Sequence, residues 1–201
     1  MGFVRRCAKH FLCLLTGCAL VLGMSGCRKT NKIVLVPIGS APIGEINALV
    51  DYYHDKFKVD VTVLPPMQLD ATDVDTERKQ LVAESVVESM RQTYPEYAVK
   101  SSVVMIGITG QDMYLRSEDW AFCFGWRDAD NHAAVVSTAR MDLHYRGEPK
   151  GEATLRQRLR KMVTKDIGIL YYGKSPNDDP KSVLYGGILG IQELDQVGED
   201  F

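Results

Sequence analysis

Histidines are the first residues to consider for metal chemistry, because a neutral imidazole nitrogen is a common zinc ligand. Beyond its first 27 residues the chain carries His54, His132 and His144. No two of them have the spacing of a helical or short-loop metal site. Their spacing therefore does not predict a metal centre. His144, close to Asp142, remains open as a functional residue.

Carboxylates and one thiol are the remaining candidates for chemistry. Asp70, Asp73 and Asp75 are not followed by the glycine and the distal glutamate of a calcium-binding EF-hand loop. They predict a solvated polar loop. Cys123 lies in an apolar stretch without a neighbouring histidine, so we expect a buried strand residue and not a nucleophile.

The first 27 residues differ from the rest of the chain. They hold four of the five cysteines and three basic residues, and no aspartate or glutamate. A basic stretch, an apolar run over 11–22 and small residues before Cys27 follow the order of a secretory signal. The run is interrupted and shorter than the roughly 20 residues of a membrane span. Residues 1–26 therefore predict a cleaved signal peptide; an uncleaved anchor helix is the alternative.

The end of this segment carries a second signal. Met24-Ser25-Gly26-Cys27 resembles a bacterial lipobox, in which the cysteine thiol is diacylated and the chain is cut before it. The resemblance implies lipidation of Cys27 by chains such as palmitate, a tether over 27–32 and a single domain over 33–201. We expect an exported lipoprotein anchored to a bacterial membrane, on its periplasmic face or at the cell surface.

Composition limits the class of the remaining chain. The protein has 201 residues, 45% of them hydrophobic, with 24 Lys and Arg against 26 Asp and Glu. These values are typical of a globular protein and exclude a disordered chain. A formal net charge of −2 leaves no basic surface for nucleic acid, so nucleic acid is excluded as a partner.

Hydrophobic periodicity predicts alternating strands and helices that must position any site. Strands are expected at 33–38, 59–63, 103–108, 121–126 and 133–137, with a turn at 128–131. Helices are expected over 43–53, over 81–90 with Thr76 or Asp75 as N-cap, and over 155–170. This order predicts one α/β (α+β) domain, a twisted mixed sheet packed with helices including one long helix near the end.

Six short fragments of this domain form an ordered pattern. They are Pro37-Ile38-Gly39, Leu64-Pro65-Pro66, the run 76–80, the run 106–114, Phe122-Cys123-Phe124-Gly125 and the run 133–140. In this order they resemble the archaemetzincins, a family of metzincin-type zinc metalloproteases. In that family the long helix carries H-E-x-x-H-x-x-G-x-x-H, where three histidines bind zinc and the glutamate activates the metal-bound water.

This motif falls on residues 165–175 and is degenerate. Lys165, Ile169 and Ser175 stand at the three ligand positions, and Asp166 stands where the glutamate is expected. An ammonium repels a metal cation and a hydrocarbon cannot bind one. The resemblance therefore implies a metalloprotease fold that has lost its zinc cofactor.

Aromatic residues surround the degenerate motif and leave the function open between three hypotheses. Tyr171, Tyr172 and Tyr185 either pack the helix end or line a groove for a peptide or protein ligand. The leading hypothesis is a catalytically inactive pseudoenzyme that binds a partner or has a structural role in the cell envelope. The alternatives are an active peptidase or hydrolase that uses Asp166 in a non-standard site, and an envelope scaffold without a ligand.

Overall fold

The computed structural model describes residues 32–142 and 151–201. Cys27, the expected signal peptide and His144 lie outside these residues, so the predictions for them stay predictions. Within the described residues, no helix combines the length and the apolar character that crossing a membrane requires.

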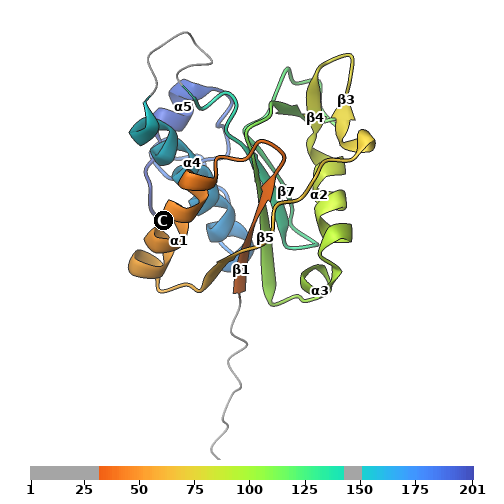
Figure 1. The fold of residues 1–201 in the computed structure, drawn as a ribbon. Coiled ribbons are helices and arrows are strands. Elements are labelled where there is room, and N and C mark those ends of the chain that lie inside the picture. Colours follow the sequence, from red (N-terminus) through yellow and green to blue (C-terminus); the bar gives the residue numbers. More distant parts are fainter. Residues whose placement is uncertain (1–31, 143–150) are drawn as a thin grey trace, which may run out of the picture.

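A five-stranded mixed sheet forms the centre of the domain (Figure 1), in the order β2-β1-β5-β8-β7. Four strands are parallel, namely β1 (Lys32–Ile38), β2 (Val61–Val63), β5 (Val103–Thr109) and β8 (Ala133–Ser137). The edge strand β7 (Gly125–Asp128) is antiparallel to β8, joined to it by the short turn that the sequence predicts. The strand predictions at 33–38, 103–108 and 133–137 are confirmed, because continuous β-branched and apolar runs are typical of buried parallel strands.

Helices cover both faces of this sheet (Figure 1). One face carries α1 (Ile43–Phe57), α4 (Glu152–Asp166) and α5 (Ile191–Gln196), and the other carries α2 (Ala83–Thr93) and α3 (Pro95–Ala98). The α4 segment is rich in Leu, Arg, Gln, Lys and Met, which have high helix propensity. A mixed α/β fold is thus confirmed.

The core consists of two clusters separated by the sheet, because neighbouring strand residues point to opposite faces. On β1, Ile33 and Leu35 pack on the side of α1 and α4, whereas Val34 and Val36 pack on the side of α2. All four side chains are fully buried. The sheet therefore holds the end of α4 and the strand β7 in a fixed relation, and both contribute to the candidate site.

A second, three-stranded sheet corrects two predictions. It consists of β3 (Val74–Asp75), β4 (Gln80–Val82) and β6 (Met113–Tyr114), so the domain has two sheets and not one. The helix predicted from the Thr76 region is wrong in its start, because α2 begins only at Ala83. Asp75 Oδ1 accepts hydrogen bonds of 3.0 Å from the backbone N–H groups of Glu77 and Arg78, which closes a hairpin turn instead of capping a helix.

The strand predicted at 121–126 is also wrong over its first four residues. Strand β7 starts at Gly125, and residues 119–124 form an irregular segment. Within that segment the backbone N–H of Cys123 donates to the carbonyl of Met113, 2.9 Å away. Cys123 is buried as expected, but in a loop that connects the two sheets.

Candidate functional site

The end of α4 places two charged residues inside the protein. Lys165 and Asp166 are its last residues, with 4% and 0% of their surface exposed. The chain then continues as one π-helical turn, Ile167–Tyr171, and the N–H of Tyr172 donates to the carbonyl of Ile167. Single π-helical turns are frequent at functional sites.

Asp166 forms a buried ion pair with Arg127 of the edge strand β7. Arg127 Nη1 donates to Asp166 Oδ1 over 2.7 Å, and the second carboxylate oxygen, Oδ2, has no hydrogen-bond partner among the described residues. Burial raises the pKa of Asp166, and the nearby guanidinium of Arg127 opposes this rise. The carboxylate is thus fixed between helix and strand.

Lys165 is held differently. Its Nζ donates to the backbone carbonyl of Tyr185. The pKa of Lys165 is lowered to about 8, mainly by burial and also by the positive charge of Arg127, while Asp166 acts in the opposite direction. The ammonium is the main form at neutral pH, but its burial has an energetic cost.

A pocket of about 410 Å³ lies where this helix end faces β7 and the irregular segment. Arg127 and Lys165 are its two basic residues. The remaining lining is mostly apolar or aromatic and comes from Asp119, Trp120, Ala121, Phe122, Cys123, Phe124, Gly125, Met162, Gly186, Ile188 and Leu189. A mainly apolar cavity with a few polar groups is typical of a ligand-binding site.

Hydrogen bonds from the second sheet fix one wall of this pocket. Arg78 Nη2 donates to the carbonyls of Trp120 and Ala121, at 3.0 and 3.1 Å. Gln80 Nε2 donates to the same carbonyl of Ala121 at 2.9 Å. The small sheet therefore orders the irregular segment and with it the rim of the pocket.

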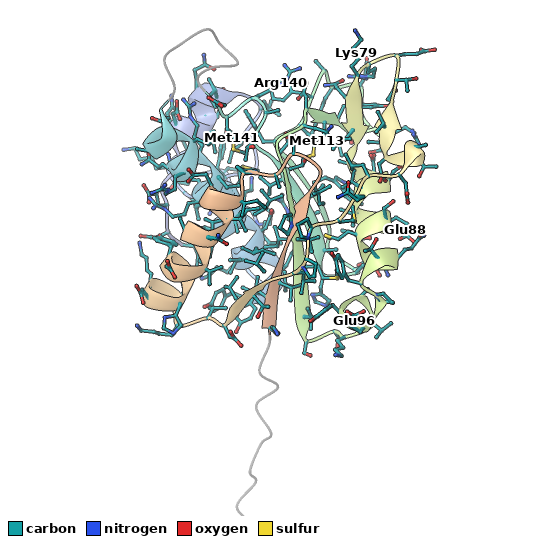
Figure 2. All side chains as sticks on the ribbon, viewed as in Figure 1. Lys79, Glu88, Glu96, Met113, Arg140 and Met141 are labelled. Carbon is teal, nitrogen blue, oxygen red and sulfur yellow. The ribbon has the colours of Figure 1, made fainter. Side chains whose placement is uncertain are left out.

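Arg140 supports the same wall from the end of the central sheet (Figure 2). Its guanidinium lies 4.1 Å from the ring centre of Phe122 and forms a bidentate ion pair with Asp112. A guanidinium stacked on an aromatic ring and paired with a carboxylate has little freedom to move. The pocket wall is thus formed before any ligand arrives.

Comparison with known proteins gives a consistent result. No family model matches the chain. Archaemetzincins from Pyrococcus furiosus and Haloquadratum walsbyi are 23% and 28% identical to it, over 77% and 75% of this chain and 80% and 83% of theirs. A zinc-dependent peptidase from Methanocorpusculum labreanum has a TM-score of 0.72 at 20% identity, covering 84% of this chain and 95% of that one. The chain is archaemetzincin-like.

The structure of an archaemetzincin supports the same fold. The protein from Archaeoglobus fulgidus, complexed with malonate, has a TM-score of 0.66 at 19% identity, and the alignment covers 84% of this chain and 94% of that one. At 19–20% identity these structures support the fold alone. The chemistry of the site has to be inferred from the residues of this archaemetzincin-like chain.

The described residues of this archaemetzincin-like chain do not fit a zinc ion. Of the three positions that the degenerate motif assigns to ligands, Lys165 lines the pocket, Ile169 packs half-buried against the core, and Ser175 is exposed. In the described ranges no group of three His, Cys, Asp or Glu side chains is placed to hold a metal. Lys165 and Arg127 instead line the same pocket. Arg127 belongs to no sequence motif, so the sequence did not predict it as a site residue.

The three tyrosines do not line this pocket. Tyr171 and Tyr172 contact each other with ring centres 4.8 Å apart, and Tyr172 also contacts Phe201. Tyr185 contributes its backbone carbonyl to Lys165. The ring contacts of Tyr171 and Tyr172 agree with the packing alternative, and the pocket described above lies beside the irregular segment 119–124.

The remaining candidate residues have different surroundings. His54 is exposed beside Asp55, and His132 occupies a left-handed turn position with a φ of 51°. Asp73 is fully buried and accepts a 2.7 Å hydrogen bond from Ser89, which corrects the prediction that it is solvated. Burial raises the pKa of Cys123 to about 12, so its thiol is a poor nucleophile.

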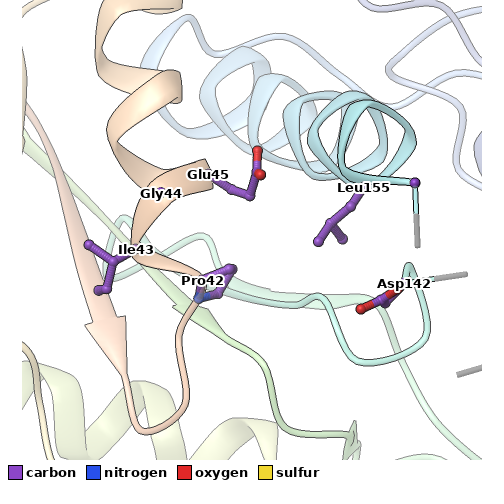
Figure 3. A pocket seen from close by; sticks show the side chains of 7 residues that line it. Pro42, Ile43, Gly44, Glu45, Asp142 and Leu155 are labelled. Carbon is purple, nitrogen blue, oxygen red and sulfur yellow. The ribbon is translucent and has the colours of Figure 1, made fainter. Parts of the chain in front are cut away.

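A second, shallower pocket of about 220 Å³ lies where α1 begins (Figure 3). Pro42 and Ile43 form one side, and Leu155 and Asp142 face them from the other. The carboxylate of Glu45 is already paired with Arg156 at 2.7 Å. The pocket borders residues outside the described part of the chain, and we assign no role to it.

Proposed function

We propose that this chain is a membrane-anchored bacterial lipoprotein that has kept an archaemetzincin-like fold and pocket for binding but has lost zinc-dependent hydrolysis. The observation that carries the proposal is Lys165: a buried ammonium, bonded to the Tyr185 carbonyl, stands at the position that the resemblance gives to the first zinc ligand. An ammonium has no lone pair to donate to a metal.

Loss of the metal removes the chemistry that a zinc peptidase needs. Zinc polarises the scissile carbonyl and lowers the pKa of its bound water to about 7. The side chains of Ile169 and Ser175 are a hydrocarbon and an exposed hydroxyl, which do not replace two imidazoles. Hydrolysis by that route is therefore not expected.

The hydrolase alternative depends on Asp166, and its environment argues against it. A general base must lie within hydrogen-bonding distance of the proton that it abstracts, directly or through one water. Asp166 has no exposed surface, is paired with Arg127 and does not line the pocket. Its role is better explained as a link between α4 and β7.

Binding of a peptide is favoured by the position of β7 at the edge of the central sheet. Among the described strands β7 has only one neighbour, β8, so its other edge has main-chain groups that an extended peptide can pair with. The pocket lies directly against this strand. The peptidase name of the Methanocorpusculum relative supports a peptide as the class of ligand.

Metal content and peptide hydrolysis test the loss of zinc chemistry. We expect the purified full-length chain to hold far less than one zinc per chain by mass spectrometry, and to show no chelator-sensitive cleavage of a peptide library. Stoichiometric zinc would overturn the proposal. Cleavage that survives the chelator but is abolished by Asp166→Asn would instead support the hydrolase alternative.

A further inference from the structure

We infer that the pocket beside β7 takes the C-terminal residue of a peptide, with its carboxylate on Lys165 and Arg127 and its apolar side chain against the aromatic wall. This inference rests on the proposed binding function and names the part of the peptide that is recognised. Three features of the pocket carry it: its charge, its apolar rim and its order.

The charge of the inner pocket is unbalanced. Lys165 and Arg127 both line it, and the one carboxylate paired with them, Asp166, is already bonded to Arg127. An ammonium has three donors and a guanidinium has five, yet each side chain has one acceptor among the described residues. Asp119 lies on the exposed rim, where water screens its charge. The inner pocket therefore has spare donors and an excess positive charge for an anion.

The rim of the pocket is unusually apolar for an exposed surface. Trp120 and Leu189 are 46% and 67% exposed and both line it, together with the buried side chains of Phe124 and Met162. Exposed large apolar side chains around a cavity indicate a binding surface. A small anion would make no apolar contacts with this rim. A residue that has both a free carboxylate and a large apolar side chain would contact the rim and the basic groups together.

The pocket is ordered, which favours a small anchor over a loosely bound ligand. The carbonyls of Trp120 and Ala121 are fixed by Arg78, so binding does not have to order this segment. The volume of about 410 Å³ lies within the range of roughly 300–1,000 Å³ that is common for small-ligand sites. It suits one terminal residue, with the rest of the peptide along β7.

The test compares two peptides that differ only in charge at one end. A fluorescently labelled hexapeptide ending in phenylalanine is titrated with the full-length chain, once as the free acid and once as the C-terminal amide. We expect amidation to weaken binding at least tenfold. We expect Lys165→Met to weaken free-acid binding to the level of the amide, whereas Lys181→Met, which removes an exposed lysine outside the pocket, should leave binding unchanged.

The pH dependence gives a second measurement on the wild-type chain. Because burial lowers the pKa of Lys165 to about 8, its ammonium is lost in mildly alkaline solution. Free-acid affinity should fall as the pH rises above about 8, and amide affinity should not change. This measurement does not depend on the folding of any variant.

The outcomes separate the two levels of the hypothesis. If free acid and amide bind equally, the carboxylate inference is wrong and peptide binding stands. If neither peptide binds, the proposed peptide-binding function fails as well. If 3-phenylpropionate displaces the free-acid peptide and binds as tightly, a small apolar acid is the ligand and the assignment to a peptide terminus is overturned.

Discussion

At the residue scale, the burial of the Lys165 ammonium opposes folding. A buried ammonium that has one hydrogen-bond acceptor loses more in hydration than it regains. Its pKa falls from 10.5 to about 8 for this reason. A group that is retained despite such a cost is a reasonable candidate for function.

This cost predicts the stability of Lys165→Met. Below pH 8 both the folded and the unfolded chain carry the ammonium, so the wild type bears the full cost of burial. Between pH 8 and 10.5 only the unfolded chain stays protonated, so wild-type stability rises with pH. The variant should be more stable at pH 7 by up to about 3 kcal/mol, and the gain should vanish by pH 10.5. Urea unfolding without ligand measures the difference in unfolding free energy between the variant and the wild type. A difference that does not change with pH would contradict the lowered pKa of Lys165.

At the element scale, α4 is tied to the segment that follows the pocket. Arg158, whose side chain is 5% exposed, donates to both carboxylate oxygens of Asp195 and to the carbonyl of Met141, each at 2.7 Å. Lys161 Nζ donates to the carbonyls of Leu194 and Asp195. These bonds hold α5 against α4 and leave the end of α4 a fixed base for Lys165.

Arg158→Met tests this tie. Three hydrogen bonds are lost, two of them to a carboxylate, but Asp195 is half-exposed and regains water. We expect the free energy of unfolding to fall by about 2–4 kcal/mol. The control, Lys56→Met, breaks the exposed pair with Asp200 and should cost less than about 1 kcal/mol. Equal effects of the two variants in urea unfolding would show that burial of Arg158 is unimportant.

Some elements of the fold can be predicted from the sequence alone, and others cannot. Apolar runs of β-branched residues identified β1, β5 and β8, because burial on both faces leaves a continuous pattern. The start of α2 was misplaced because Leu81 and Val82 have helical spacing to Ser85 and Val86 but belong to a three-residue strand, β4. A three-residue strand is too short to show the alternation of apolar and polar residues that predicts a strand. Only the tertiary pairing of β4 with β3 and β6 decides their structure.

At the scale of the whole molecule, the pocket joins segments that are distant in the sequence. The residues come from 119–127, from the end of α4 and from 186–189. The family resemblance drew attention to Lys165, but Arg127 carries no motif, and its pairing with Asp166 spans 39 positions. Residue spacing reports neighbours along a helix or strand, so it could not find a site assembled by packing across the fold.

The proposed attachment to a membrane depends on acyl chains at Cys27, which lies outside the described residues. Among the described residues no helix is long and apolar enough to cross a bilayer. Each buried lipid CH₂ contributes about 0.8 kcal/mol, and a single chain binds only reversibly, so stable anchoring needs more than one.

Metabolic labelling with radioactive palmitate should therefore mark the wild-type chain and Cys18→Ser, which keeps the expected lipidation site. Cys27→Ser should be unlabelled and should retain residues 1–26, since cleavage before the cysteine follows its acylation. Labelled Cys27→Ser protein would contradict the assignment, because the acyl chains would then be carried by another residue and the boundary between signal and domain would have to move.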